Sequence, residues 1–290
     1  MTQNIAQPVA VIMTLYRADP LDAFELALSS LENQTLEATI RVYLCVDGPL
    51  PESHEVWLEQ NATRFHKVLH NETNLGLARS LNRLIDLLED EEFVFRMDGD
   101  DISLPSRFER QIELMRAEPD LGLCGCQAID IDDDGKELAP RKFPVTPEET
   151  RHRLSRITPV LHPTFCIRRT ILRDPKMRYP DAYLCEDLAF LVTLTGAGHS
   201  ISNHPETLFK WRTGKNFFKR RQDARREWVE MSWYFRALRA NGRLFSPQAV
   251  FPVLRFIMRI LPQSWIVWLY GSPLRNFVIG KDAKQKSFPT

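Results

Sequence analysis

Hydrophobic and polar positions alternate along the first two thirds of the chain in a way that predicts strands followed by helices. Near-continuous apolar runs, typical of buried strands, lie at residues 9–16, 40–46, 93–95 and 121–129. Apolar positions three or four residues apart, typical of amphipathic helices, lie at 21–33, 75–88 and 104–117. This order is typical of α/β proteins with a largely parallel sheet.

The pattern changes after residue 146. We predict a short helix at 147–156, a polar entry at His162 into a strand, and a helix at 185–194. Glu186 and Asp187 fall in the first turn of that last helix. Carboxylates are favoured at a helix N-terminus by the helix dipole, so helix capping is an alternative to a catalytic role for this pair.

Residues 216–290 form a separate region that is helical, basic and rich in Trp. We predict one helix at 217–240 and an apolar helix at 250–261, with Arg255 and Arg259 on one face. The longest uncharged stretch, 260–274, is shorter than the about 20 residues that a spanning helix needs. This region therefore lies in a membrane interface, with its basic side chains at the headgroups, or packs as a helical subdomain on residues 1–215.

Charge is distributed unevenly, although the formal net charge is zero. Residues 1–150 hold 13 Lys and Arg against 29 Asp and Glu, a net of −16, and residues 151–290 carry +16. A basic C-terminal region indicates an anionic partner, such as lipid, phosphate or nucleic acid. No signal-peptide pattern opens the sequence, and the five Cys include no paired metal motif, which favours a reducing, cytoplasmic location.

Asp98, Asp100 and Asp101 follow the strand predicted at 93–95. Open α/β sheets bind ligands at the carboxyl ends of their strands. Carboxylates this close repel one another unless a cation compensates them, and hard oxygen ligands suit Mg²⁺ or Mn²⁺. The alternative is an acidic turn without a ligand, since Asp and Gly are common turn residues.

The motifs, in their order, resemble those of the family 2 inverting glycosyltransferases with the GT-A fold. They are Val46-Asp47-Gly48, Asn74-Leu75-Gly76, Arg96-Met97-Asp98-Gly99-Asp100-Asp101, His162-Pro163-Thr164, Glu186-Asp187 and Trp211-Arg212. The resemblance covers about residues 8–215 and looks closest to bacterial enzymes of lipopolysaccharide, capsule or exopolysaccharide synthesis, of the amylovoran glycosyltransferase kind. It implies a Rossmann-like mixed sheet with helices on both faces, a nucleotide-diphospho-sugar transferase domain at 1–215, and a C-terminal helical appendage at 216–290.

The resemblance also implies roles for individual residues. Asp187, with Glu186 as second choice, matches the catalytic base, and His162 lines the acceptor pocket. Asp98 and Asp100 hold Mn²⁺ or Mg²⁺, and Asp100 is the direct ligand. The positions that match nucleotide-sugar contacts are Thr14, Tyr16, Arg17, Asp47, Gly76, Arg79, Asp98, Arg212 and Lys215. Two departures matter: Val46 replaces a frequent Asp, and the Gln-x-x-Arg-Trp motif of polymerising relatives is absent, which favours transfer of a single sugar.

The function that this resemblance implies is transfer of one sugar from a nucleotide sugar, with UDP as the default base. The implied acceptor is a glycan on a polyprenyl diphosphate or lipopolysaccharide lipid, at the inner face of the inner membrane. One alternative is an inactive membrane-associated scaffold with the same fold. A nucleotidyltransferase is disfavoured because the loop after the first strand, 17–20, lacks Gly. Nucleic-acid binding is disfavoured by the Trp and Leu content of the basic tail.

Overall fold

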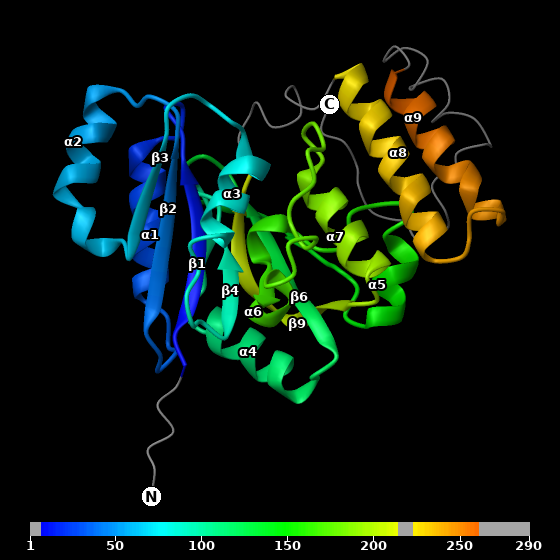
Figure 1. The fold of residues 1–290 in the computed structure, drawn as a ribbon, viewed down its shortest axis with the longest axis horizontal. Helices are drawn as coiled ribbons and strands as arrows, with labels where there is room; N and C mark the ends of the chain where they lie inside the picture. The colour runs from blue at the N-terminus through cyan, green and yellow to red at the C-terminus, as the bar shows by residue number, and fades with distance from the viewer. Residues whose placement is uncertain (1–6, 214–222, 261–290) are drawn as a thin grey trace, which may run out of the picture.

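A mixed β-sheet forms the centre of the molecule (Figure 1). The computed structural model describes residues 7–213 and 223–260 of the 290-residue chain. In this part the strand order is β3-β2-β1-β4-β8-β6-β9-β5, with β7 beside β6. The strands are β1 (Val9–Leu15), β2 (Ile40–Asp47), β3 (Lys67–Asn71), β4 (Phe93–Arg96), β5 (Ile102–Ser103), β6 (Leu121–Ile131), β7 (Glu137–Arg141), β8 (Cys166–Arg168) and β9 (Ser200–Arg212).

Helices cover both faces of the sheet, as the sequence predicted. The helices are α1 (Leu21–Glu32), α2 (Glu52–Gln60), α3 (Leu77–Ile85), α4 (Arg107–Ala117), α5 (Pro147–Arg153), α6 (Arg169–Leu172), α7 (Glu186–Gly196), α8 (Ala224–Ala240) and α9 (Val250–Ile260). Alternate residues of β1 face opposite sides: Val11 packs with α1 and α4, whereas Ile12 packs with α3 and α7. The apolar run at 9–16 is continuous because both of its faces are buried.

Strand direction brings the predicted site residues to one edge. β1 is parallel to β2 and β4, and β2 is parallel to β3. The short β8 is antiparallel to β4 and β6, so β6 runs parallel to β4, and β9 runs parallel to β6. The carboxyl ends of β2, β4 and β9 therefore lie at the same edge of the sheet. Asp47, Asp98 and Arg212 are located there, at or just after the ends of these strands.

Several element bounds differ from the prediction. β7 was not predicted, because its residues are mostly exposed and include Pro140, which suits a strand that pairs only with β6. β9, which begins at Ser200, is long because it pairs with β6 along most of its length. The helix predicted from 104 begins at Arg107, since Ile102 and Ser103 pair with β9.

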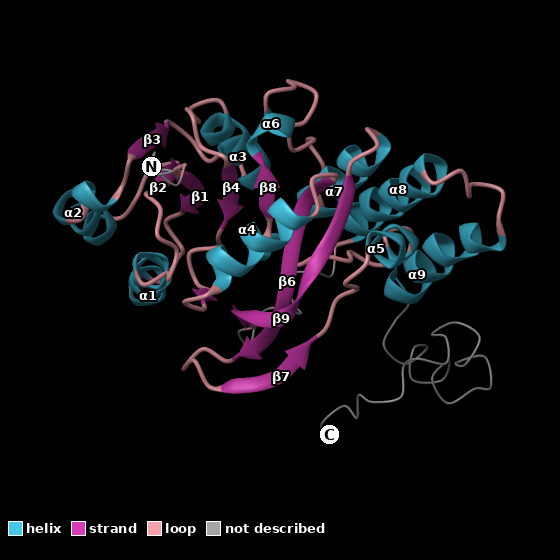
Figure 2. Ribbon diagram, turned by 90° about the horizontal axis from the view of Figure 1, so that it is seen from below, coloured by secondary structure: helices cyan, strands magenta, loops and turns pink. Residues whose placement is uncertain are grey.

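The C-terminal helices α8 and α9 pack against one another, and α8 packs onto α7 (Figure 2). Trp233 of α8 packs beside Ala189 of α7. On α9, Arg255 and Arg259 form ion pairs with Glu227 and Glu230 of α8, so the described structure gives them protein partners and not the predicted headgroups. This favours the packed subdomain for α8 and α9.

No described helix combines the length and apolar character needed to cross a bilayer. α8 begins at Ala224, where the Asp223 side chain accepts bonds from two backbone N–H groups. Three predicted features lie outside the described residues: the first part of the predicted helix, at 217–222, the domain boundary after residue 215, and the Trp-rich stretch after residue 260.

Candidate active site

Three carboxylates meet in the loop that joins β4 to β5. Oxygen atoms of Asp98, Asp100 and Asp101 lie within 4.8 Å of one another. The end of β9 fastens this loop, because the Arg212 backbone N–H donates to Asp101 Oδ1 at 2.8 Å and the Arg212 Nε donates to the Asp100 carbonyl at 2.8 Å. Asp101 thus binds a strand more than one hundred residues away in the sequence.

The electrostatics of this loop favour a bound cation. Burial, with the charges of Asp98 and Asp19, raises the pKa of Asp100 to about 6. Burial and the Asp100 charge raise the pKa of Asp101 well above its ordinary value. The buried Asp101 Oδ2 has no hydrogen-bond partner within the described residues. Crowded, partly buried carboxylates with an unused oxygen fit a divalent cation that prefers oxygen ligands.

In a second group of acids, the carboxylates are neutralised by side chains of the protein. Oxygen atoms of Glu89, Asp90 and Glu91 also lie within 4.8 Å of one another. However, Arg41 forms ion pairs with all three, and the buried Glu91 also accepts a hydrogen bond from Tyr43. This second group is balanced by protein cations, so the Asp98 loop is the better metal candidate in the described structure.

Arg96, the last residue of β4, pairs with the acidic loop that follows it. Its guanidinium is buried and pairs with Asp98, whereas Nε and Nη1 have no hydrogen-bond partner among the described residues. Burial disfavours the charge of Arg96, but Asp98 keeps its pKa above the ordinary value. Arg96 belongs to a motif recognised in the sequence, but no role was predicted for it. A charged residue at the end of an otherwise apolar strand could have indicated one.

Glu186 and Asp187 occupy the first turn of α7 and face the same region. Burial and the Asp187 charge raise the pKa of Glu186 to about 7. Arg96 lowers this pKa and Asp98 raises it, so both side chains are close enough to influence Glu186 electrostatically. The structure therefore brings together two acidic groups that lie almost ninety residues apart in the sequence.

Residues 10–174 match the family model described as Glycosyl transferase family 2. The chain belongs to this family. Two curated relatives align along nearly their whole length. The amylovoran biosynthesis glycosyltransferase AmsE of Erwinia amylovora is 30% identical over 90% of this chain and 97% of its own. The UDP-Gal:alpha-D-GlcNAc-diphosphoundecaprenol beta-1,3-galactosyltransferase of Escherichia coli is 25% identical over 93% of this chain and 97% of its own.

Solved structures confirm the GT-A fold. S. aureus TarS residues 1–349 with UDP-GlcNAc align with TM-score 0.59 and 17% identity, covering 87% of this chain and 81% of that one. The mannosyltransferase PcManGT from Pyrobaculum calidifontis, with GDP-Man and Mn²⁺, aligns with TM-score 0.59 and 14% identity, covering 95% and 86%. The chain is a family 2 glycosyltransferase, and the fold class predicted from the sequence is confirmed.

In this family 2 glycosyltransferase, Asp47 shapes a neighbouring loop. The side chain is buried, and its Oδ1 accepts bonds from the Leu75 N–H and the Asn71 amide, both at 2.8 Å. The other oxygen accepts from the Gly76 N–H at 3.0 Å. Because both oxygens are occupied, the described geometry gives the Asp47 carboxylate a part in shaping the 74–76 loop. Its contact with the nucleotide base stays a prediction.

The remaining donor-site predictions fall into two groups. Tyr16 and Arg17 follow β1, where the Tyr16 N–H donates to Asp19 Oδ2 at 2.7 Å, and Thr14 lies close to the acidic loop at Gly99. Asp19 was not predicted, although its charge acts on Asp100.

Arg79, by contrast, is paired with the exposed Asp181 at 2.8 Å. Arg212 also binds the Asp132 and Asp133 carbonyls through Nη1, which ties the end of β9 to the turn before β7. Lys215 lies outside the described residues.

His162 lies near the acids but is enclosed. Its Nε2 is 3.0 Å from the Tyr179 hydroxyl, and its ring packs against those of Phe165 and Tyr179. Burial and the Arg96 charge hold the pKa of His162 well below its ordinary value, so the ring is neutral. A neutral, 8% exposed imidazole can act on an acceptor only through a small opening, and its acceptor role stays a prediction.

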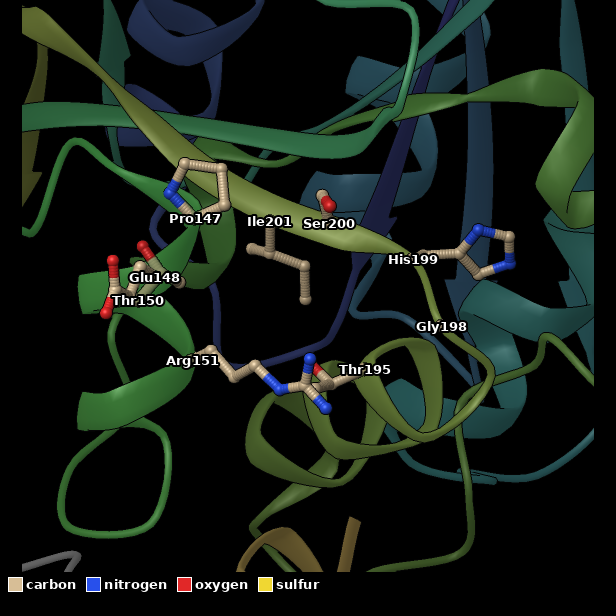
Figure 3. A pocket seen from close by; sticks show the side chains of 9 residues that line it. All are labelled: Pro147, Glu148, Thr150, Arg151, Thr195, Gly198, His199, Ser200 and Ile201. Carbon is tan, nitrogen blue, oxygen red and sulfur yellow. The ribbon is translucent and has the colours of Figure 1, made fainter. Parts of the chain in front are cut away.

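A separate cavity lies far from this site. It has a volume of about 240 Å³ and is lined by α5, the end of α7 and the start of β9, with Arg151, Thr195 and Ser200 among its residues (Figure 3). Ser200 begins β9, whereas Arg212, beside the acidic loop, ends it. At about 3.3 Å per residue, the two ends of β9 are roughly 40 Å apart. The cavity is therefore not part of the acidic site.

Proposed function

We propose that this glycosyltransferase moves one sugar from a nucleotide sugar to a lipid-linked glycan, with inversion at the anomeric carbon, in cell-surface polysaccharide synthesis. The observation that carries the proposal is the cluster of Asp98, Asp100 and Asp101 at the carboxyl edge of the sheet, with Asp98 close enough to Glu186 to raise its pKa. The likeness to the amylovoran biosynthesis relative supports the pathway class.

The donor side of the reaction uses the acidic loop. Asp98 and Asp100 would hold Mn²⁺ or Mg²⁺, which, when bound, supplies positive charge for the departing diphosphate. The solved neighbour with GDP-Man and Mn²⁺ supports this assignment. UDP is the favoured nucleotide, because the galactosyltransferase relative is named for a UDP-sugar and TarS was solved with UDP-GlcNAc.

The acceptor side of the reaction needs a base. The acceptor hydroxyl oxygen forms a bond to the anomeric carbon while the bond from that carbon to the diphosphate oxygen breaks, and the hydroxyl proton moves to the Asp187 carboxylate. A single displacement of this kind inverts the configuration and needs no covalent enzyme intermediate. Glu186 supplies a second carboxyl group in the first turn of α7. Its pKa is about 7, so it carries a proton at lower pH.

The acceptor is proposed to be a glycan on a polyprenyl diphosphate or on a lipopolysaccharide lipid, at the inner face of the inner membrane. The relative that uses a diphosphoundecaprenol-linked acceptor supports a lipid carrier. The outward face of α9 also supports it, because apolar side chains spaced along one side of the helix are exposed. These are Val250, Val253, Ile257 and Ile260.

A donor screen tests the proposal. Purified protein is incubated with UDP-, GDP- and dTDP-sugars, with Mn²⁺ or with EDTA, and nucleoside diphosphate release and calorimetric donor binding are both followed. We expect one donor to bind and react only with the metal, and Asp100→Ala to abolish that metal-dependent binding. Donor binding that is equal with Mn²⁺, with EDTA and in Asp100→Ala would contradict the metal site. Absence of both binding and release across the panel would favour an inactive scaffold.

A further inference from the structure

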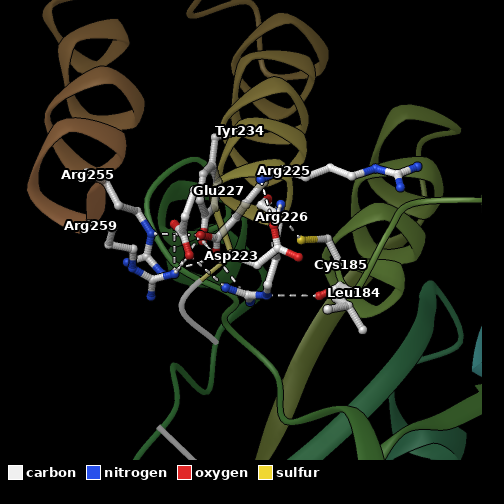
Figure 4. A network of polar contacts seen from close by, with 10 residues as sticks. Leu184, Cys185, Asp223, Arg225, Arg226, Glu227, Tyr234, Arg255 and Arg259 are labelled. Carbon is white, nitrogen blue, oxygen red and sulfur yellow. Dashed lines mark hydrogen bonds and ion pairs between the residues drawn. The ribbon is translucent and has the colours of Figure 1, made fainter. Parts of the chain in front are cut away.

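The short segment that leads into α7 is fastened to the beginning of α8 at three consecutive residues, of which Figure 4 shows Leu184 and Cys185. The Tyr183 hydroxyl donates to Asp223 Oδ2 at 2.9 Å. Arg226 Nε donates to the Leu184 carbonyl at 3.2 Å, and the Cys185 thiol approaches the Arg226 carbonyl at 3.8 Å. Glu186 and Asp187 follow directly, so α8 contacts the backbone immediately before the carboxylates.

Leu184 has an unusual backbone conformation. Its φ is 52°, which makes it the one non-Gly residue with positive φ in the described structure, and its side chain is exposed. The left-handed region is disfavoured for a Leu, so the conformation persists only where the surroundings hold it. The Arg226 hydrogen bond is made to the carbonyl of this residue, and the adjacent Ala182 and Cys185 pack against Val229 and Trp233 of the same helix.

Arg226 is itself held in place by a network of charges. The side chain is buried, and its Nη1 donates to Glu227 Oε1 at 3.0 Å. Glu227 and Glu230 also accept bonds from Arg255 and Arg259 of α9, so three guanidinium groups share two carboxylates (Figure 4). The bond to Glu227 holds the guanidinium against the 183–185 segment, while Arg255 of α9 pairs with Glu230 on the next turn of α8.

We propose that Arg226 is a positioning residue for sugar transfer: its side chain fixes the Leu184 carbonyl and thereby aims the first turn of α7 at the acceptor. The inference rests on the proposed role of Asp187 as base. On this inference, α8 belongs to the catalytic unit. The boundary between the transferase domain and the C-terminal appendage then lies after the α8 residues that contact residues 183–185. Small errors in the placement of a catalytic group cost large factors in rate, so the loss should appear in turnover.

The test compares two substitutions of Arg226 with a matched control. Arg226→Gln removes the charge, whereas Arg226→Lys keeps a buried cation beside Glu227 and lacks the Nε donor. Arg255→Gln is the control, because it breaks an ion pair of the same network and does not contact residues 183–185. Each variant is measured for melting temperature, donor binding, kcat, KM and the pH profile of kcat.

We expect Arg226→Gln to lower kcat about 10-fold or more, with donor affinity within twofold and with the kcat profile moved to higher pH, because the carboxylates lose a nearby cation. Arg226→Lys should restore the pH profile and recover kcat only in part. Arg255→Gln should lower the melting temperature and keep both kcat and the profile. Should Arg226→Gln fail to fold, Arg226→Lys decides: full wild-type kcat in this variant overturns the inference.

Failure of the proposed function would look different. Asp187→Asn should lower turnover by about 10² or more with donor binding intact. If Asp187→Asn keeps wild-type turnover, the base assignment fails and Arg226 has no base to position. If Asp187→Asn is inactive while both Arg226 variants keep wild-type kcat and pH profile, the base assignment stands and the positioning role of Arg226 is wrong.

Discussion

At the scale of residues, the site is governed by buried charges that compensate one another only in part. Asp101 and Arg96 are both buried, and each has polar atoms without a hydrogen-bond partner in the described structure. Groups of this kind are costly unless a ligand or a metal completes them. Perturbed carboxylates that lie at a ligand-binding edge are typical of functional sites. The acidic loop and the first turn of α7 meet that description together.

The raised pKa of Glu186 predicts a measurable dependence of stability on pH. A carboxyl whose folded pKa lies at about 7, above the ordinary 4.5, stabilises the fold when protonated, and this contribution disappears as the pH rises through 7. Asp187 and Asp98 raise the pKa and Arg96 lowers it. Without divalent cations, the stability of Glu186→Gln relative to that of wild type should therefore increase from pH 5 to pH 8.

At roughly 1.4 kcal/mol per pKa unit, the gain amounts to at most about 3 kcal/mol, or several degrees in melting temperature. Thermal unfolding of both proteins at the two pH values measures it. The exposed Glu55→Gln on α2 serves as the control and should show no such gain. If the difference in melting temperature between Glu186→Gln and wild type is the same at pH 5 and at pH 8, the pKa of Glu186 is not raised.

At the scale of elements, sequence patterns predicted the strands and helices that bury a complete face. β1, β2 and β4 were recognisable because these central parallel strands are largely apolar. The exposed β7 carries no comparable pattern and was not predicted, whereas the three-residue β8 lies where the sequence predicted a strand after His162. The contacts of Arg96 and Arg226 could not be predicted for another reason: each depends on which loops the topology brings together.

The loop after β2 offers a test of how elements shape the donor site. Gly48 has φ of +93°, and a Cβ there would lie 2.8 Å from the Asn74 backbone nitrogen. Gly48→Ala should therefore destabilise the protein by about 2–4 kcal/mol, from backbone strain together with a steric clash. It should also weaken donor binding, because the displaced segment is the 74–76 loop that Asp47 holds.

Gly135→Ala is the matched control for this loop. Its φ is +82°, but no atom lies within 4 Å of the added Cβ, so it carries the backbone cost alone. Chemical denaturation of both variants separates the cost of backbone strain from that of the steric clash. Equal destabilisation, with donor binding unchanged in both, would show that the approach of the 74–76 loop to Gly48 is unimportant.

At the scale of the whole molecule, the charged and apolar faces of α9 point in opposite directions. Arg255 and Arg259 face α8 and its two Glu residues, while Val253 and Ile257 are 39% and 41% exposed on the outside. The sequence suggested that these arginines reach lipid headgroups, whereas among the described residues they pair with α8 and the apolar side of the helix is exposed. A bilayer surface matches an exposed apolar stripe next to a chain region with an excess of basic residues.

Membrane binding through α9 is therefore expected to depend on its apolar face. The full-length double variant Val253→Ser, Ile257→Ser should bind vesicles containing anionic lipid about 10-fold more weakly, because each buried CH₂ contributes about 0.8 kcal/mol. The control is Leu138→Ser, which removes a comparably exposed apolar side chain from β7. Co-sedimentation at two salt concentrations separates apolar from electrostatic attraction. Wild-type binding by the double variant would exclude this face of α9 from the membrane contact, whereas loss in Leu138→Ser alone would move the contact to the β7 edge.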